Sequence, residues 1–272
     1  MIHDTHRKIR SLIREMLNEI DIEEIGQTCW APGSTHDLKT CTVGNDKYYL
    51  KFSDPDLFGA DDPSLQILNE YLAYRIFRLF PGINIPERVE PVYDRIGKRV
   101  GLMTTPAAGS SGRNISSKQL AKLLSSSVYA SIFLAHWDIS NTANVIVSQD
   151  ANRATLIDPG GTMDFRARGE RKGTMFGDDP SELSSMISGP RSRTDIFDGA
   201  DLRQAAEEFL AVNWSKMSST IQEVLKEVSD DLQERGMDRL LSQWQGYVSR
   251  IEPILSKRHK TIVLHAQHIL ES

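Results

Sequence analysis

One stretch of the chain carries three polar side chains whose types and spacing suit metal-assisted chemistry on a phosphate. It runs from His136 to Gly161 and contains Asp138, Asn144 and Asp158. Two short apolar segments lie between Asn144 and Asp158, and a β-hairpin made from them would bring these two side chains to one end of the ribbon. Their oxygens would then suit Mg²⁺, which prefers carboxylate, carbonyl, water and phosphate ligands. Asp138 would lie nearby, placed to orient or deprotonate a hydroxyl.

The glycines that follow Asp158 would let the backbone approach a phosphate closely, because they have no Cβ. Each of these residues taken alone also has an ordinary interpretation. An aspartate before a glycine pair is typical of a turn, and an asparagine is common at the start of a strand. The order of all three in one segment favours the functional interpretation.

A lysine and a glutamate closer to the N-terminus could complete such a site. Lys51 alternates with Leu50 and Phe52 near the end of an expected strand, and Glu70 lies inside the helix that follows. An ion pair between Lys51 and Glu70 would aim the ammonium at a phosphate. The simpler alternatives are an exposed lysine on a strand edge and a glutamate on the solvated flank of a helix.

A basic loop follows Asp158, and its guanidinium groups could bind phosphate in a bidentate way or hold an anionic substrate. Its charged members, which lie within seven residues, are Arg166, Arg168, Arg171 and Lys172. The alternative is a solvated loop whose charges pair with the acidic residues directly after it, Asp178, Asp179 and Glu182.

The apolar pattern predicts the elements that would position these residues. In the first part of the chain we expect an amphipathic helix over 4–22, a helix over 64–79 with Ser64 as its N-cap, and strands over 28–31, 38–43, 47–52, 87–93 and 99–104. A linker rich in Gly, Ser, Pro and Ala covers 105–114. Beyond it we expect a long helix over 117–136, strands over 144–147 and 154–157, and helices over 202–212, 218–235, 237–255 and 259–270.

This order of elements predicts an α+β fold in two parts. Residues 1–106 would hold a small, mostly antiparallel sheet with one inserted helix, and residues 107–272 would be mainly helical. Ligands often bind between two such parts.

Composition excludes several classes of protein. The 272 residues carry 32 basic and 37 acidic side chains, a net charge of −5, whereas proteins that bind duplex nucleic acid usually have a basic excess. No apolar run approaches the ~18 residues of a membrane span. The two cysteines, Cys29 and Cys41, are not spaced as a metal pair. We therefore expect reduced thiols and a cytoplasmic protein, with delivery of a bacterial protein into a host cell as an alternative.

The order of these parts resembles the protein-kinase-like fold over about residues 27–186. The parts are a strand lysine, a helix glutamate, a linker, a His-x-Asp loop, an asparagine before a strand and an Asp-x-Gly triplet after it. The sequence looks most like the atypical branch of that superfamily, which includes HipA-type bacterial kinases, phosphatidylinositol kinases and kinase-like modules of bacterial effectors and toxins. The resemblance implies two lobes, with a small antiparallel β-sheet N-lobe and a mainly helical C-lobe.

The resemblance also implies a role for each residue of the candidate site. Lys51 would contact the α- and β-phosphates of ATP, and Glu70 would hold Lys51. Asp138 would be the catalytic base, and Asn144 and Asp158 would bind Mg²⁺, with Mn²⁺ as an alternative. Residues 102–106 would form the hinge that reads adenine through its backbone, and the expected nucleotide contacts there and in the phosphate loop are Met103, Thr104, Thr105, Gly33, Ser34 and Thr35.

Several features depart from the pattern of ordinary protein kinases. The glycine-rich loop is replaced by Pro32-Gly33-Ser34-Thr35, and the usual arginine before the base is Trp137. Asn144 follows Asp138 by six residues rather than five, so Asn141 is a rival metal ligand. The metal-binding triplet reads Asp-Pro-Gly, and no Ala-Pro-Glu follows. These departures argue against control by phosphorylation of an activation loop.

The sequence thus predicts an ATP- and Mg²⁺-dependent phosphotransferase that acts on a hydroxyl, with serine or threonine of a protein as the expected acceptor. A small-molecule or lipid kinase, a nucleotide-binding pseudokinase and an AMP-transferring enzyme are the alternatives within the same fold. A helical interaction scaffold is the alternative without nucleotide chemistry.

Overall fold

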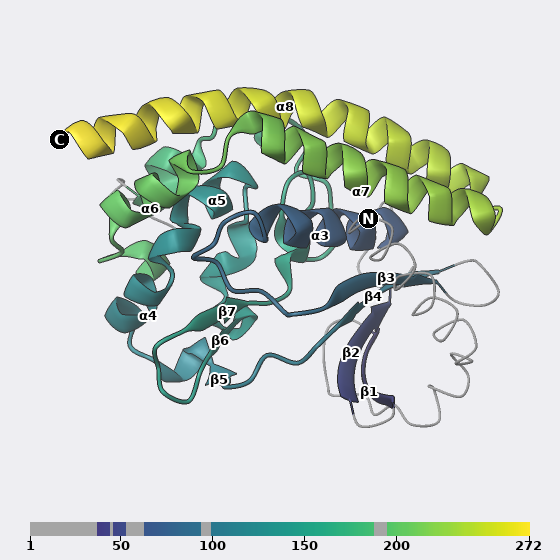
Figure 1. The fold of residues 1–272 in the computed structure, drawn as a ribbon, viewed down its shortest axis with the longest axis horizontal. Coiled ribbons are helices and arrows are strands. Elements are labelled where there is room, and N and C mark those ends of the chain that lie inside the picture. Colours follow the sequence, from purple (N-terminus) through teal and green to yellow (C-terminus); the bar gives the residue numbers. More distant parts are fainter. Residues whose placement is uncertain (1–36, 44–45, 53–62, 94–98, 188–194) are drawn as a thin grey trace, which may run out of the picture.

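The structure is a computed structural model, and it describes residues 37–43, 46–52, 63–93, 99–187 and 195–272. The expected helix over 4–22, the strand over 28–31 and the phosphate loop with Gly33, Ser34 and Thr35 lie outside the described residues. The described elements form a mixed fold, in which an antiparallel sheet is joined to a mainly helical part (Figure 1).

The larger sheet has four antiparallel strands in the order β1-β2-β4-β3. The strands are β1 (Asp37–Val43), β2 (Asp46–Phe52), β3 (Val89–Tyr93) and β4 (Val100–Thr104). These agree with the expected strands to within two residues. Strand β2 lies between β1 and β4, so Lys51 is paired on both sides, with Leu38 and with Leu102. The alternative of an exposed edge lysine is therefore wrong.

Helix α3 (Pro63–Phe77) joins the sheet to the helical part, and nearly all of its side chains are buried. It begins one residue before Ser64, at Pro63, which suits the first turn of a helix because proline has no N–H to leave unpaired. Ser64 is therefore not the N-cap. In Figure 1 this helix lies between the sheet and the long helices α7 (Trp214–Glu234) and α8 (Asp238–Glu271).

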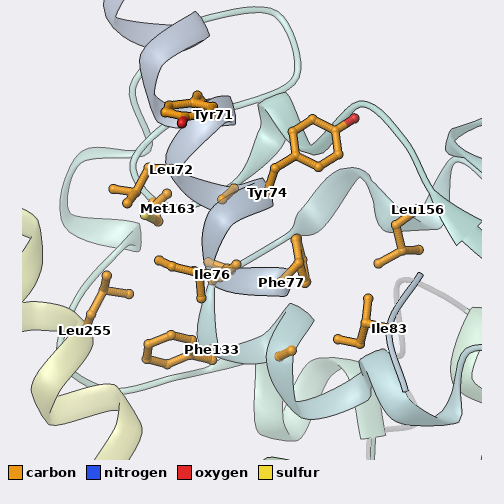
Figure 2. Packing of buried hydrophobic residues seen from close by; sticks show 14 of the residues in the cluster. Tyr71, Leu72, Tyr74, Ile76, Phe77, Ile83, Phe133, Leu156, Met163 and Leu255 are labelled. Carbon is orange, nitrogen blue, oxygen red and sulfur yellow. The ribbon is translucent and has the colours of Figure 1, made fainter. Parts of the chain in front are cut away.

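The core surrounds α3 on several sides. Figure 2 shows Ile76 of α3 directed toward Phe133 and Leu255 of α8, while Phe77 lies on the side of Leu156 and Ile83. The helical pattern predicted one apolar stripe, but the helix is buried around its circumference because it packs against the sheet, α7 and α8 together. Burial of Phe77 and Ile76 is complete, and each such side chain contributes about 1.5–3 kcal/mol of transfer free energy.

A second, three-stranded sheet lies below α3 in Figure 1, with the order β5-β6-β7. Its strands are β5 (Ser110–Ser111), β6 (Val145–Val147) and β7 (Ala154–Leu156). The expected hairpin of β6 and β7 is confirmed, with Val145 opposite Leu156. Asn84, just after α3, adds a parallel bridge to Thr155 of β7 and ties this hairpin to the end of α3.

The long helix expected over 117–136 is instead two short helices, α4 (Ser117–Leu123) and α5 (Val128–Phe133). A 3-10 turn, Ser125–Ser127, separates them. The hydroxyl of Ser125 donates to the carbonyl of Lys122 at 2.9 Å, and that of Ser127 to Leu124 at 2.7 Å. Serine side chains that bond to nearby backbone in this way compete with helical hydrogen bonds.

At the C-terminus, by contrast, two expected helices are found as one. After α6 (Leu202–Leu210) and α7, the two helices expected over 237–255 and 259–270 form one continuous helix, α8. Arg258 lies where we expected the break, and it is fully buried and bonded to three other segments of the chain. These bonds anchor this part of α8 to the segments against which it packs.

Cys41 on β1 is buried and disulfide-bonded, so the expectation of a reduced thiol at this position is wrong. Disulfide formation depends on the distance between two Cα atoms in space, which the separation of cysteines along a sequence does not give.

Among the described helices, none combines the length and the apolar character needed to cross a bilayer.

Candidate functional site

Lys51 lies at the centre of the site, and two carboxylates hold its ammonium group. The Nζ atom is 2.7 Å from Oε2 of Glu70 and 2.6 Å from Oδ1 of Asp158. Burial alone would lower the pKa of Lys51, but the charges of Asp158 and Glu70 outweigh it, and the pKa is raised. Lys51 therefore carries a fixed positive charge on the face of the sheet that meets α3.

Glu70 is almost completely buried on α3, which rules out the solvated flank that the sequence left open. Burial raises the pKa of its carboxyl to about 7, and Lys51 works against this rise. A buried carboxylate is costly unless it is paired, so the ammonium of Lys51 is what makes the charged form of Glu70 tolerable.

Asp158 lies two residues beyond β7 and has left-handed backbone, with φ 53° and ψ 57°. Few residues other than glycine adopt this region, and such outliers gather at functional sites. The hydroxyl of Tyr74 accepts a hydrogen bond of 2.8 Å from the backbone N–H of Asp158, which helps to hold the turn. The turn directs the carboxylate to Lys51 and leaves about a third of the side chain, 36%, accessible.

Asp138 and Asn144 form the second half of the site. The Asn144 side chain donates to Oδ2 of Asp138 at 2.7 Å and to its backbone carbonyl at 3.4 Å. Burial and the charge of Asp158 raise the pKa of Asp138, and the hydrogen bond from Asn144 opposes this. The pKa of Asp138 thus moves toward the range in which a carboxylate can accept a proton from a hydroxyl.

The two halves meet at Gly160 and Gly161. A Cβ on Gly160 would lie 3.1 Å from Oε2 of Glu70 and 3.4 Å from both Lys51 Nζ and Asp158 Oδ1. A Cβ on Gly161 would lie 2.9 Å from the Cβ of Asp138. The backbone of this turn therefore passes against the ion pair on one side and against Asp138 on the other.

The hairpin fixes the relation between Asn144 and the turn at Asp158. The N–H of Ile157 donates to the carbonyl of Asn144 at 2.9 Å, which continues the ladder of β6 and β7 by one residue. Asn144 and Asp158 thus lie at the same end of the ribbon, as the sequence predicted. The five residues Lys51, Glu70, Asp138, Asn144 and Asp158 come from separate elements and share one region of the molecule.

The oxygens of Asn144 and Asp158 fit a hard divalent cation such as Mg²⁺. The Asn144 amide nitrogen is directed at Asp138, so its oxygen is turned away from that carboxylate. Asn141, the rival ligand, uses its side-chain oxygen to cap its own turn, accepting from Ala143 N at 3.3 Å. Its nitrogen donates to the side-chain oxygen of Asn144 at 3.4 Å. Each asparagine oxygen thus already accepts a hydrogen bond, and Asn144 stays the predicted metal ligand with Asn141 as its rival.

Within the described ranges, no three His, Cys, Asp or Glu side chains gather in a way that could hold a metal. A site of one amide and one carboxylate needs further oxygens, and Mg²⁺ commonly takes these from water and from substrate phosphates.

The expected hinge leaves the sheet at the end of β4. Met103 is buried and pairs with Leu50 and Glu90, and Thr104 ends the strand. The N–H of Thr105 donates to the carbonyl of Arg88, and its hydroxyl accepts from the N–H of Arg88, both at 3.1 Å. Thr105 therefore cannot offer its N–H to a base, because that donor already extends the pairing with the chain before β3.

The basic loop after Asp158 differs from the expectation at two of its four positions. Lys172 is 2% exposed, and its ammonium donates to two backbone carbonyls. Arg171 donates to Asp164 at 2.9 Å and lies over the ring of Phe165. Neither can reach a phosphate in this arrangement, so the expectation is corrected for both. Arg168 is exposed and Arg166 is partly exposed, and their role as phosphate or substrate contacts stays a prediction.

Two of the three acidic residues after the loop, Asp178 and Glu182, form their ion pairs with α8 rather than with the loop. Glu182 accepts hydrogen bonds from the indole of Trp137 at 2.7 Å and from Arg258 at 2.8 Å. Asp178 pairs with Lys257 at 2.5 Å. The acidic cluster thus fastens the loop region to α8, and the alternative of pairing within the loop is wrong for these residues.

Sequence reasoning gave no role to Tyr74 or His136, and it gave the wrong role to Lys172. Tyr74 bonds to Asp158, His136 is a buried histidine two residues before Asp138, and Lys172 bridges two loops. A signal existed for Tyr74, because it follows Glu70 by four residues and shares its helix face. No sequence spacing indicates the contacts of His136 or Lys172, which depend on how two loops meet.

Comparison with protein-family models and with curated proteins finds no match. Among solved structures, the chain is similar to the Helicobacter pylori proinflammatory kinase CtkA, with 14% sequence identity and a TM-score of 0.42. The similarity covers 85% of this chain and 94% of that one. The likeness is distant, and it carries no part of the function proposed next.

Proposed function

We propose that this protein is an ATP- and Mg²⁺-dependent phosphotransferase that transfers the γ-phosphoryl group to a hydroxyl. The observation that carries the proposal is the position of Lys51, whose ammonium lies between a buried glutamate and an accessible aspartate. A cation held in this way on a sheet, beside a carboxylate suited to Mg²⁺, is the arrangement that kinases use for phosphoryl transfer. Bound Mg²⁺ would neutralise charge on the phosphates, with Asn144 and Asp158 as its protein ligands.

The other residues of the site have roles that follow from their positions. Glu70 holds Lys51 in place, and Lys51 binds phosphate oxygens through its ammonium. Asp138 accepts the proton of the acceptor hydroxyl, and Asn144 orients the carboxylate of Asp138 through its hydrogen bond. Positioning and charge neutralisation supply most of the rate in this chemistry.

The acceptor we propose is the hydroxyl of a protein serine or threonine, in keeping with the resemblance of the sequence to the atypical kinases. The proposal is tested by incubating the chain with Mg²⁺ and ATP labelled in the γ-phosphate, alone and with a crude lysate. We expect label on protein, stable to acid as a phosphoester is. A parallel incubation with ATP labelled in the α-phosphate should give none.

Each other outcome has its own meaning for the proposal. Label from the α-phosphate would show transfer of AMP, and label only in small molecules or lipids would move the acceptor to that class. Binding of ATP without any transfer, with Mg²⁺ and with Mn²⁺, would overturn the enzymatic proposal in favour of a pseudokinase.

A further inference from the structure

Lys172 is a buried lysine that the proposed chemistry does not use. Its Nζ donates to the carbonyl of Ala135 at 2.6 Å and to the carbonyl of Gly161 at 2.9 Å. The same atom lies 4.6 Å from the centroid of the Trp137 ring, close enough for a cation–π contact. The ammonium has three donor hydrogens, and these three partners surround it.

The two carbonyls belong to the two loops that carry the catalytic residues. Ala135 lies three residues before Asp138, and Gly161 lies three residues after Asp158. The loops touch at this point, because a Cβ on Gly161 would come within 2.9 Å of the Cβ of Asp138. A single ammonium thus bonds to both loops beside their closest approach.

The contact with Ala135 also closes the end of a helix. The last carbonyls of a helix have no partner within it and need donors from elsewhere. Beyond α5, the chain turns at Ala135 with φ 49°, directly before the segment that carries Asp138. Four consecutive carbonyls at this end accept from other segments: Ile132 and Phe133 from Arg258, Leu134 from the N–H of Met163, and Ala135 from Lys172. Those of Ile132 and Ala135 also accept from the nearby N–H groups of Ala135 and Trp137.

A cation at this position is costly, since burial lowers the pKa of Lys172 well below its ordinary value. A methionine would fill nearly the same volume without the cost of removing a charge from water. It could not, however, donate to both carbonyls. What the lysine adds over an apolar side chain is therefore the link between the two loops.

We propose that Lys172 is a positioning residue, which fixes Asp138 relative to the turn of Asp158 by bonding to both loops. This proposal rests on the proposed phosphotransfer, because it concerns the geometry of that site. Lys172 touches neither substrate nor metal; it acts through the backbone of the residues that do.

The test replaces Lys172 by methionine and measures kcat and the KM for MgATP separately. We expect kcat to fall about 100-fold, the size of effect that a displacement of about 1 Å produces. The KM for MgATP should change less than about threefold, because Lys51 and Asp158 remain in place. An unchanged kcat, or a rise in KM as large as the loss of kcat/KM, would overturn the proposal.

A conservative variant guards against simple loss of folding. Lys172→Gln keeps a donor for one carbonyl, so it should fold where Lys172→Met does not, and its kcat should lie between those of the methionine variant and the natural chain. A glutamine variant that is folded, as judged by circular dichroism, and fully active would contradict the proposal. Lys260→Met, an exposed lysine on α8, is the matched control and should leave both constants unchanged.

Hydrogen exchange without nucleotide separates this proposal from the proposed function. Amides of residues 136–147 should exchange faster in Lys172→Met than in the natural chain or in Lys260→Met. If the natural chain transfers no phosphate, the proposed function fails, and the exchange rates of Lys172→Met then test the link by themselves. Faster exchange than in the natural chain would support the link by Lys172, and equal exchange would contradict it. If exchange and transfer are both normal in Lys172→Met, the proposal for Lys172 fails while the function stands.

Discussion

The ammonium of Lys51 lies 2.6 Å from the carboxylate of Asp158, although 107 positions separate them in the sequence. The same ammonium bonds to Glu70 of α3 at 2.7 Å, so three elements meet at one cation. Two carboxylates around one ammonium leave net negative charge in the site. A divalent cation would compensate this charge, which is a physical reason to expect metal dependence.

Replacing Lys51 by methionine should abolish transfer while the chain still folds. Removal of one partner from a buried pair commonly costs about 3–5 kcal/mol. Glu70 reduces this cost by taking up a proton, because burial already raises its pKa to about 7. We therefore expect a loss of less than about 3 kcal/mol in the free energy of unfolding, measured with urea.

The pH dependence of this variant gives a second check. A buried acid whose pKa is higher in the folded than in the unfolded chain favours folding at low pH and loses that contribution as the pH rises. The natural chain loses this contribution as the pH approaches 7, whereas without Lys51 the pKa of Glu70 is higher still, so the stability of Lys51→Met should keep falling, relative to the natural chain, as the pH rises above about 7. A parallel course for the two proteins over this range would show that Glu70 does not depend on Lys51 for its charge.

Asp138→Asn should separate binding from chemistry. The amide keeps the shape of the side chain but cannot accept a proton, and loss of a general base costs about 100-fold to 10,000-fold in rate. We expect a fall of that size in kcat and little change in the affinity for MgATP, measured by titration with a fluorescent nucleotide. Full activity in this variant would show that Asp138 is not the base.

Gly160→Ala should disturb the ion pair directly. Its Cβ would lie 3.1 Å from Oε2 of Glu70 and 3.4 Å from Lys51 Nζ, so the pair must move to admit it. We expect at least about a tenfold rise in the KM for MgATP, because the displaced ammonium binds phosphate less well. Unchanged kinetics would mean that the turn is not in contact with the reacting groups.

Gly246→Ala is the matched control for this substitution. It lies inside α8, and nothing lies within 4 Å of the added Cβ. Alanine is favoured over glycine within a helix by about 0.5–1 kcal/mol, so this variant should be slightly more stable and equally active.

His136 should make the folded chain sensitive to mild acid. Burial and the nearby charge of Lys172 lower its pKa to about 3, and its Nδ1 atom is buried without a partner. The unfolded chain takes up a proton near pH 6.5, so this contribution to stability is present above that pH and is lost as the pH falls toward 3. Between about pH 7.5 and pH 5 the natural chain should lose about 2 kcal/mol more than His136→Gln in urea unfolding. Equal losses would show that His136 titrates normally.

Local patterns in the sequence were enough to predict the strands and the hairpin of the site. Alternation of apolar residues placed β2 and β4, and turn residues placed the hairpin between Asn144 and Asp158. The meeting of Lys51, Glu70 and Asp158 followed from a resemblance of order, since no local pattern connects residues so far apart. The phosphate loop predicted at Gly33, Ser34 and Thr35 stays a prediction.

The errors came from interactions that a linear pattern does not contain. Ser125 and Ser127 bond to the backbone where the expected long helix is interrupted, and Arg258 anchors the continuous helix α8 through bonds to other segments. The wrong prediction for Lys172 has the same origin, because its contacts with two distant loops are not visible in the sequence pattern. Its charge beside other basic residues predicted a phosphate contact, whereas the fold buries it between two loops.

The convergence of these residues on one magnesium nucleotide can be measured most directly by hydrogen exchange with a non-hydrolysable ATP analogue and Mg²⁺. We predict that peptides covering 46–52, 138–147 and 157–163 become protected together, and that Asp158→Asn removes the protection from all three. Protection of one peptide alone, or none in the natural chain, would show that Lys51, Asn144 and Asp158 do not serve a common ligand.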